Sequence, residues 1–559
     1  MSTAAAAIPQ SEPASPLQAA ASPAAPSVPA HPARVPVNKW LVTISISFGT
    51  LMGAIDSSIV NVALPHIRGA VGATLQEITA IATGYAVALV LVMPLTAFLS
   101  RQFGQKRVYM ACLVLFLAGS LLCGFATSLT TLVIYRVLQG LGAGALQPTE
   151  QAILRQTFPP KEQGMAMALF GMAVMLGPAI GPTLGGYIVD HYHWSWIFFI
   201  NLPIGILGLF MVASFVHEDP ELLAHNKVLA EQQRKHLDWL GIMFMWIGLA
   251  ALQYFLEEGA RDDWFDSRVI TAVFLVAVFA LAAFVIRELT APFPAVDLKL
   301  FKDPVFLSGT VVGGLMFAML MANMFLLPIF MQELLGFSAV QSGFALMPRV
   351  IVMMLAVPIV GRLYQLFSPQ LFIGFGVLLF SVSSYLLSNL TLESGTSDIT
   401  IPLSLQGIAF ACLFVPLTTI SLSTIPRHKM ADATGTSSLI RQMGGAIGLA
   451  VFATKIGTYA TIARGGINPH LALTRPEVWQ RMQAMQASFM ARGYDAVSAK
   501  AAAMRAMTGG AIGQSMVLAF DHVFILAGGL FLFVLPLLFL LRTPKQASAV
   551  DTKEMHVEM

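Results

Sequence analysis

The sequence is poor in charge. Only 11% of its 559 residues are Asp, Glu, Lys or Arg, whereas 56% are hydrophobic. Soluble domains usually carry about 25% charged residues, so this composition cannot cover a surface that faces water. The net charge of +3 gives no indication of nucleic-acid binding. The scarcity of charge therefore excludes a large soluble protein and favours one whose outer surface faces lipid.

Cysteine and the signatures of enzymes are also scarce or absent. The three cysteines, Cys112, Cys123 and Cys412, lie in apolar runs without metal-ligand spacing or a disulfide framework. The zinc motif HExxH, the nucleophile elbow GxSxG and the phosphate loop GxxxxGK[ST] do not occur. We therefore expect a protein that is not an enzyme and has no metal and no cofactor.

Long apolar runs recur along nearly the whole chain. A helix needs about 20 mostly apolar residues to cross the hydrocarbon core of a membrane. Segments that meet this requirement are expected near 40–64, 77–100, 108–127, 130–154, 164–188, 196–216, 238–256, 269–288, 305–331, 341–363, 370–389, 399–423, 432–454 and 516–541. The fold class predicted is an all-α polytopic membrane protein with about 14 spans.

The loops between these spans predict their orientation. Cytoplasmic loops are enriched in Lys and Arg. With a cytoplasmic N-terminus, the short outer loops contain only Arg68, Arg261 and Arg268. The inner side then holds Arg101, Lys106, Arg107, Arg155, Lys161, Lys227, Arg234, Lys235, Arg287, Lys299, Lys302, Arg362, Arg427 and Lys429. We expect a bacterial inner-membrane protein with both termini in the cytoplasm.

Composition and span positions also divide the chain into parts. The parts expected are a disordered cytoplasmic tail at 1–39, a six-helix half at 40–216, a cytoplasmic linker at 217–236, two extra transmembrane helices at 237–288, a second six-helix half at 289–541 and a cytoplasmic tail at 542–559. A weak repeat, PLTAFLSRQFGQK at 94–106 and PIVGRLYQLFSPQ at 358–370, supports two parallel halves. Parallel halves place a substrate site between them, near the middle of the membrane.

One long segment of the second half is expected to stay outside the membrane. Residues 456–515 contain apolar side chains at helical spacing: Trp479, Met482, Met485, Phe489 and Met490. This spacing predicts an amphipathic external helix, as one arm of a hairpin.

Two charged residues lie inside expected spans of the first half. Asp56 lies well within the first span, where a carboxylate costs about 2.5–3.5 kcal/mol on insertion scales. Its alternatives are a proton-carrying group and a carboxylate in a permanent structural pair. Arg136 opens the fourth span and keeps its charge, so it can act on a nearby carboxylate; the alternative is snorkelling to a membrane interface.

The fourth span continues with Gln139, Gly140 and Glu150. The run GLGAG at 140–144 follows a helical apolar stretch and not a strand, so we interpret it as close helix packing and not as a dinucleotide loop. Glu150 could share proton or cation handling with Asp56, or lie solvated near the cytoplasmic mouth.

The string GPAIGPTLGG in the fifth span contains two overlapping GxxxG spacings, which allow helix backbones to touch. Its two prolines each remove a backbone donor and predict a bend. A hinge that seals one side of a pore would suit this string. Its residues of interest are Gly177, Pro178, Gly181, Pro182, Gly185 and Gly186. Arg349 and Arg441 are further intramembrane charges with no expected interface nearby.

Together these strings resemble the major facilitator superfamily, and within it the fourteen-span drug:proton antiporters of the EmrB/QacA type. The resemblance covers about residues 40–541 and includes IDSSIVNVALP, RVLQGLGAG and GPAIGPTLGG in order. It also includes WSWIFFINLPIGI at 194–206 and QGIAFACLFVPLTTISLSTIP at 406–426.

The resemblance implies export of hydrophobic or amphipathic compounds by alternating access, driven by a proton gradient. It assigns proton coupling to Asp56 and Arg136, and it assigns the antiporter motif to Gly177–Gly186. It makes the inner loop LSRQFGQKR a gating loop, with Arg101, Gly104, Lys106 and Arg107. In that loop Arg101 stands where the wider family has an acid, which puts the usual charge-relay gate in doubt.

The resemblance further implies small-molecule substrates, contact with membrane lipid, and a periplasmic adaptor of the EmrA type with an outer-membrane channel beyond it. The alternatives are an exporter or importer of one metabolite, such as a sugar, amino acid or siderophore, and a membrane sensor or assembly protein that transports nothing.

Overall fold

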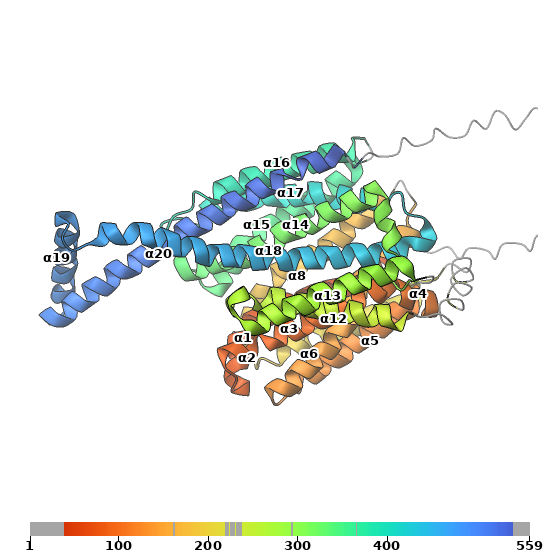
Figure 1. Cartoon of the computed structure of the whole chain (residues 1–559), viewed down its shortest axis with the longest axis horizontal. Helices are drawn as coiled ribbons and strands as arrows, with labels where there is room; N and C mark the ends of the chain where they lie inside the picture. The colour runs from red at the N-terminus through yellow and green to blue at the C-terminus, as the bar shows by residue number, and fades with distance from the viewer. Residues whose placement is uncertain are drawn as a thin grey trace, which may run out of the picture. The chain divides into compact units, whose positions relative to one another are not determined.

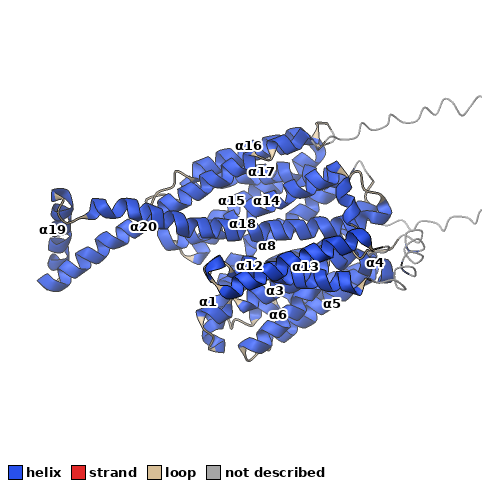
Figure 2. Ribbon diagram, in the orientation of Figure 1, coloured by secondary structure: helices blue, strands red, loops and turns tan. Residues whose placement is uncertain are grey.

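The computed structural model describes residues 38–159, 162–218, 223, 230, 238–291, 294–364, 366–539 and 541. All regular structure in these ranges is helical, and no strand occurs in them (Figure 2). The expected all-α fold is therefore confirmed. The two expected tails and most of the linker at 217–236 lie outside the described residues.

The described helices include 14 that are long and apolar enough to cross a membrane, the number expected. The principal helices are α1 (Lys39–Val71), α2 (Leu75–Ile78), α3 (Ala80–Val92), α4 (Thr96–Phe103), α5 (Gln105–Gly124), α6 (Leu129–Gly144), α7 (Leu146–Thr157), α8 (Gln163–His191), α9 (Trp196–Phe199), α10 (Asn201–Phe215), α12 (Trp239–Glu258), α13 (Arg268–Thr290), α14 (Pro304–Ile329), α15 (Ala339–Leu363), α16 (Pro369–Leu387), α17 (Thr396–Ser421), α18 (Met430–Ile467), α19 (Pro476–Ala491) and α20 (Ala496–Leu532).

Proline and small polar residues set where several helices break or begin. Pro94 lies in a 3₁₀ turn that joins α3 to α4, and Pro148 lies in the first turn of α7 just after α6. Proline has no backbone N–H for the helical ladder, so the second and fourth spans are each divided in two. Ser128 and Ser338 begin α6 and α15 with capping boxes.

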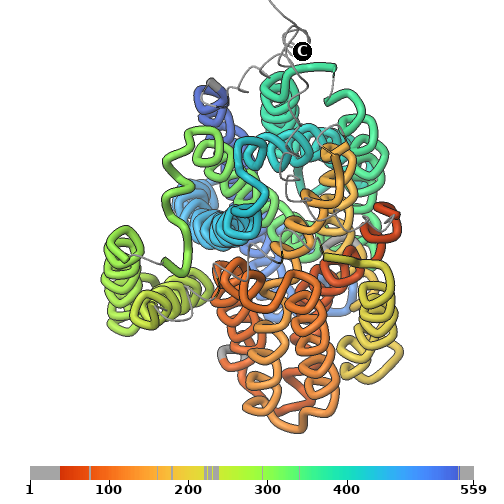
Figure 3. Tube along the Cα trace, turned by 90° about the vertical axis from the view of Figure 1, so that its right-hand side faces the viewer, coloured from red at the N-terminus to blue at the C-terminus, as the bar shows by residue number. Residues whose placement is uncertain are grey.

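The helices of each half gather into a bundle, with α12 and α13 lying beside the two bundles (Figures 1 and 3). The halves meet where α8 packs against α15 and α17, and where α18 packs against α7 and α4. The extra pair is attached through α12, which packs on α3 and α18. In that attachment the Thr83 hydroxyl donates to Glu258 Oε1 at 2.8 Å.

The last two spans extend well beyond a membrane. Helix α18 has 38 residues and α20 has 37, which corresponds to about 55 Å each at 1.5 Å per residue. The hydrocarbon core is only about 30 Å thick. The two helices pack on each other, and α19 closes the far end (Figure 1).

These lengths correct the expected form of the segment 456–515. Its arms are continuations of the spans themselves, and α19 is the short separate helix between them. The periodic residues fall on α19, where Met482 is buried against the neighbouring helix while Trp479 and Met490 remain exposed. Alanine, glycine and threonine in both arms are compatible with helix, so the sequence has no break at the membrane surface.

Glycine allows α8 to pack closely against α1. A Cβ atom on Gly181 would lie 2.6 Å from the Ser58 side chain, and one on Gly185 would lie 2.7 Å from Ile59 Cγ1. A Cβ on Gly177 would collide with Ala54. The predicted GxxxG contact is therefore present, and its partner is the helix that carries Asp56.

We expect Gly177→Leu to lower the thermal stability of the purified protein. A larger side chain would force α8 away from α1, and overpacking of this kind costs about 1–3 kcal/mol. Gly186→Leu is the matched control on the same helix, because no atom lies within 4 Å of a Cβ built there. Differential scanning fluorimetry in detergent measures both. Equal melting temperatures for the two variants would contradict the packing assignment.

Candidate functional site

The middle of α1 places Asp56 opposite Arg136 of α6. Arg136 Nη1 lies 2.6 Å from Asp56 Oδ2, and the side chains are 1% and 0% exposed. Removing one partner of a buried ion pair costs about 3–5 kcal/mol, so each charge stabilises the other. The alternative in which Arg136 snorkels to an interface is wrong, because its guanidinium is held inside the bundle.

Neutral side chains from three further positions complete the coordination of Asp56. Gln139 Nε2 and Asn201 Nδ2 donate to Asp56 Oδ1 at 2.8 and 3.0 Å. Both amides also donate to Ser120 Oγ, at 3.2 and 2.9 Å. Gln139 Oε1 accepts from Arg136 Nη1 at 2.8 Å. Helices α1, α5, α6 and α10 are thus joined by one polar network centred on a carboxylate.

Aromatic rings enclose the guanidinium. Arg136 Cζ lies 4.1 Å from the centre of the Tyr85 ring and 5.8 Å from that of Phe198. Arg136 Nε also donates to the Ile81 carbonyl at 3.4 Å. A desolvated cation over an aromatic face gains about 2 kcal/mol or more, so Arg136 keeps favourable contacts even when the carboxylate loses its charge.

Glu150 does not belong to this network. It lies on α7, is fully buried, and accepts from Ser47 Oγ at 3.0 Å. Ser47 and Asp56 are nine residues apart on α1, which corresponds to about 13.5 Å of helix. The alternative of a solvated carboxylate at the mouth is wrong for this conformation. Asp56 on α1 and Glu150 on α7 therefore belong to separate sites, which meet α1 at different heights.

The glycines of the fourth span pack against two neighbouring helices. A Cβ on Gly140 would lie 2.9 Å from Ala88 Cβ of α3, and one on Gly142 would lie 2.8 Å from the Cys112 carbonyl of α5. This geometry supports close packing as the role of the GLGAG run. In the fifth span, Pro178 and Pro182 lie within α8; the side chain of Pro178 is outside the described part of the structure.

The last turn of α4 forms an ion pair between the halves. Arg101 Nη1 lies 2.5 Å from Asp432 Oδ2 of α18. Gly104 ends α4 with a φ of +88°, where side chains other than glycine are strained. The backbone N–H of Lys106 donates to Glu218 Oε1 at 2.8 Å. The missing acid of this loop is thus replaced by carboxylates from elsewhere. Arg107 is exposed.

Two further arginines hydrogen-bond across the same boundary. Arg155 Nη2 donates to the Thr419 carbonyl at 3.1 Å, and Arg441 Nη2 donates to Gln151 Oε1 at 3.0 Å. Arg155 lies in the last turn of α7, at the end of the bundle that carries Arg101, and Arg441 lies eleven residues along α18 from Met430. Contacts between the halves therefore include charged hydrogen bonds at the end rich in Lys and Arg.

Arg349, in the middle of α15, differs from the other buried arginines. It is 3% exposed, its Nη1 atom has no hydrogen-bond partner, and no carboxylate forms an ion pair with it among the described residues. Arg441 instead donates to Ser437, Ser438 and Gln151.

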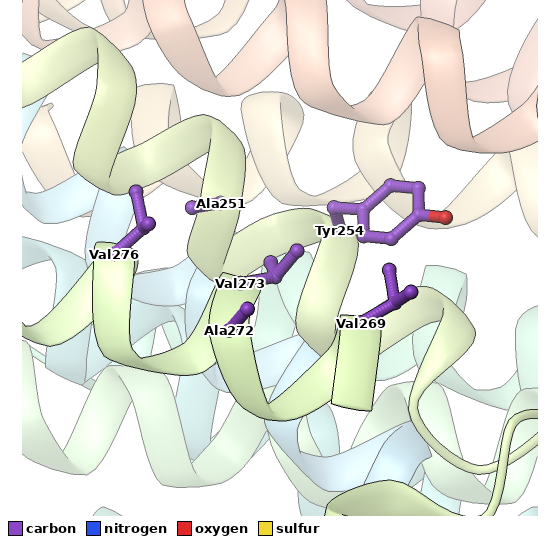
Figure 4. Close-up of a pocket in the computed structure, with 6 residues that line it drawn as sticks. All are labelled: Ala251, Tyr254, Val269, Ala272, Val273 and Val276. Atoms are coloured by element: carbon purple, nitrogen blue, oxygen red, sulfur yellow. The ribbon is translucent and has the colours of Figure 1, made fainter. Parts of the chain in front are cut away.

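A surface cavity of about 380 Å³ lies elsewhere, between α12 and α13 (Figure 4). The residues that line it are Ala251, Tyr254, Val269, Ala272, Val273 and Val276. It faces outward from the bundle and contains no ionised side chain. It has no chemistry with which to bind a proton or orient a charged compound.

The chain matches the Major Facilitator Superfamily over residues 46–449. With this match and the 14 spans, the chain belongs to the Major Facilitator Superfamily, whose members are membrane transporters of small molecules.

Individual relatives lie within the same family. The multidrug export protein EmrB of Escherichia coli K12 is 32% identical over 506 residues, covering 90% of this chain and 95% of that protein. The fatty acid resistance protein FarB of Neisseria gonorrhoeae is 35% identical over 413 residues, covering 74% of this chain and 80% of that protein. The human organic anion transporter TETRAN has a TM-score of 0.58 at 15% identity, with 90% and 100% coverage, which shows the shared fold.

Sequence reasoning singled out Gln139 but missed the other neutral members of the network and the acids that contact Arg101 and Lys106. Ser120, Asn201 and Tyr85 carry no charge, so nothing marks them within an apolar span. Asp432 lies 331 positions from Arg101, a separation that no local pattern bridges.

We expect Arg101→Asp to impair transport, because it would place two carboxylates face to face at the contact between the halves. Exchanging the pair, as Arg101→Asp with Asp432→Arg, should restore a substantial part of the lost activity. Substrate accumulation in cells that express each variant at equal level measures this. A double variant no better than either single variant would show that the ion pair does not hold the halves together.

Proposed function

We propose that this protein exports hydrophobic and amphipathic drug-like compounds across a bacterial inner membrane in exchange for protons, and that both its termini lie in the cytoplasm. The observation that carries the proposal is the buried pair of Asp56 and Arg136. The names of the relatives support multidrug export over transport of a single metabolite. The bias of Lys and Arg among the loops supports the orientation.

The pair can couple a proton to movement because only one partner titrates. Arg136 remains charged under all physiological conditions. When Asp56 takes up a proton, it loses its attraction to Arg136, which still contacts Gln139 and the Tyr85 ring. Protonation therefore loosens the contact between α1 and α6, while the Gln139 side-chain oxygen and the Tyr85 ring still hold the guanidinium.

Close backbone contact between α1 and α8 can transmit a movement of α1 to the boundary between the halves. Gly177 and Gly181 of α8 pack against Ala54 and Ser58, which lie two residues before and after Asp56. Helix α8 in turn packs against α15 and α17 of the other half. A shift of α1 at the carboxylate would reach the surfaces that separate in alternating access.

The contacts of Arg101, Arg155 and Arg441 describe a state closed toward the cytoplasm in the proposed orientation. Reaching the opposite state requires that these charged hydrogen bonds break. Each contributes about 1.5–3 kcal/mol. The binding free energy of a proton and a substrate can offset the loss of these bonds.

The external hairpin of α18, α19 and α20 supports a periplasmic partner, an adaptor of the EmrA type that leads to an outer-membrane channel. The hairpin extends past the membrane and exposes apolar side chains that no lipid covers there: Trp479, Met490, Tyr494 and Val497. Residues 456–515 contain six Lys or Arg and two Glu or Asp. A partner with an acidic surface would complement this charge.

We expect Asp56→Asn to abolish proton release driven by substrate in everted vesicles, because an amide cannot carry a proton between the two sides. Asp56→Glu keeps the titrating group and should retain part of the signal. The matched control is Glu257→Gln on α12, whose carboxylate accepts from Gln253 and does not contact the network. Fluorescence of a pH-sensitive dye across the vesicle membrane gives the rate.

Substrate-driven proton release that persists at the normal rate in Asp56→Asn would remove the basis of this function. Loss of the signal in Glu257→Gln as well would show that the assay reports general damage and not the carboxylate of α1.

We expect replacement of residues 472–494 by a short glycine-serine linker to abolish resistance in intact cells while leaving export in vesicles unchanged. The replaced part lies outside the membrane and away from the Asp56 network, whereas passage across the outer membrane needs the adaptor. Minimum inhibitory concentrations and vesicle uptake rates measure the two effects. Full resistance in cells would argue that the hairpin binds no adaptor.

A further inference from the structure

Arg349 combines deep burial with a lack of partners. The other buried arginines of the bundle each make side-chain hydrogen bonds: Arg136 binds Asp56, Arg155 binds Gln163 and Thr419 although its Nε has no partner, and Arg441 binds Gln151 with two serines. Arg349 makes no such bond within the described part of the chain, although its side chain is 97% buried. An uncompensated buried charge is strongly destabilising, and an anion brought by a ligand would compensate it.

Arg349 belongs to a helix that borders the boundary between the halves, and parallel halves form a substrate site at such a boundary. Arg349 lies near the middle of α15, the helix that packs on α8 of the first half. Met353 follows one turn later, on the same side of the helix. Met353 and Val350 enclose a space of about 10 Å³ together with Met172, Met175 and Leu176 of α8.

The seam between α8 and α15 can adapt to different apolar groups. Methionine is unbranched and polarisable, so it repacks around ligands of varied shape. The enclosed space is too small for a drug in this conformation, in which the halves are in contact. Arg349 does not line this space but adjoins it through Val350 and Met353, and its backbone packs on Gly407 of α17. Separation of the halves would open the methionine-lined space beside Arg349.

We propose that Arg349 binds the anionic head group of the substrate while the methionine-lined seam binds its apolar body, so that the preferred substrates are amphiphilic carboxylates and related organic anions. This rests on the proposed function and adds the substrate class. The guanidinium offers a planar fork of donors that matches a carboxylate. Its charge disfavours a cation at the same position.

The test compares two probes with the same ring system and opposite charge, 2-naphthoate and 2-naphthylmethylammonium. Isothermal titration calorimetry on the purified full-length protein in detergent measures both affinities, with no proton gradient present. Arg349→Gln should weaken binding of 2-naphthoate by about tenfold or more, the factor for one lost charged hydrogen bond. Binding of the cation should stay the same or tighten. Arg349→Lys, which keeps the charge, should lie between.

The matched control is Arg441→Gln, a buried arginine of the same half whose donors are already occupied. It should change the affinities of both probes by the same factor. If Arg349→Gln does not fold, Met353→Glu provides an independent variant. It places a carboxylate one turn from Arg349, where it should occupy the guanidinium and weaken 2-naphthoate binding selectively. Equal effects of Arg349→Gln and of Met353→Glu on both probes, or none on either, would overturn the proposal.

The outcome separates this proposal from the proposed function. Selective loss of 2-naphthoate binding without any proton release in wild-type vesicles would refute proton coupling and leave the anion site. Normal proton coupling with unselective binding would refute the anion site alone.

Discussion

The buried ion pair between a carboxylate and a guanidinium constrains how the helices of the N-terminal half pack. Neither Asp56 nor Arg136 is tolerable there without the other, because an unpaired ion at that depth costs several kcal/mol. The amides of Gln139 and Asn201 donate to Oδ1 of the carboxylate, and Arg136 holds Oδ2. Four helices are consequently held in one register by a single acid. A proton is the smallest change that can release this constraint, since it removes one charge and displaces no side chain.

The glycines of α8 couple the buried ion pair to the rest of the molecule, because they let α8 pack closely on α1. If α8 carried larger residues in place of its glycines, it would lie farther from α1. A displacement of α1 at Asp56 would then be taken up by side-chain rearrangement and would not move α8. Instead Gly177 and Gly181 let the backbone approach the residues beside Asp56. Interiors are close-packed, so displacement at one face of a helix is passed to its other face. The opposite contacts of α8 are with α15 and α17. The motif therefore lies between the acid and the surface at which the two halves meet.

The sequence predicts two kinds of feature in this arrangement. One is a charge whose burial in a span costs free energy, and the other is a regular pattern of apolar residues. Apolar runs of spanning length predicted all 14 spans, and a charge inside such a run marked Asp56, Arg136, Arg349 and Arg441. Ser120, Asn201 and Tyr85 escaped notice because a neutral polar residue in a span has no such cost. The partners of Arg101 and Arg441 escaped because the halves meet through residues hundreds of positions apart. The external arms of α18 and α20 were shortened in the prediction, since falling hydropathy ends a span but does not end a helix.

The two halves also differ in how they hold charge, and this difference bears on coupling. In the first half the buried cation is paired with a carboxylate, a group that can take up a proton. In the second half Arg441 is satisfied by neutral acceptors, and Arg349 by none among the residues that the structure describes. A proton adds positive charge to the first half, and an anion removes it from the second. Because both changes act on helices that touch α8, each alters the energy of the same boundary. A transporter that exchanged the two in opposite directions would need no direct contact between proton and substrate, only a boundary that tolerates one of them at a time.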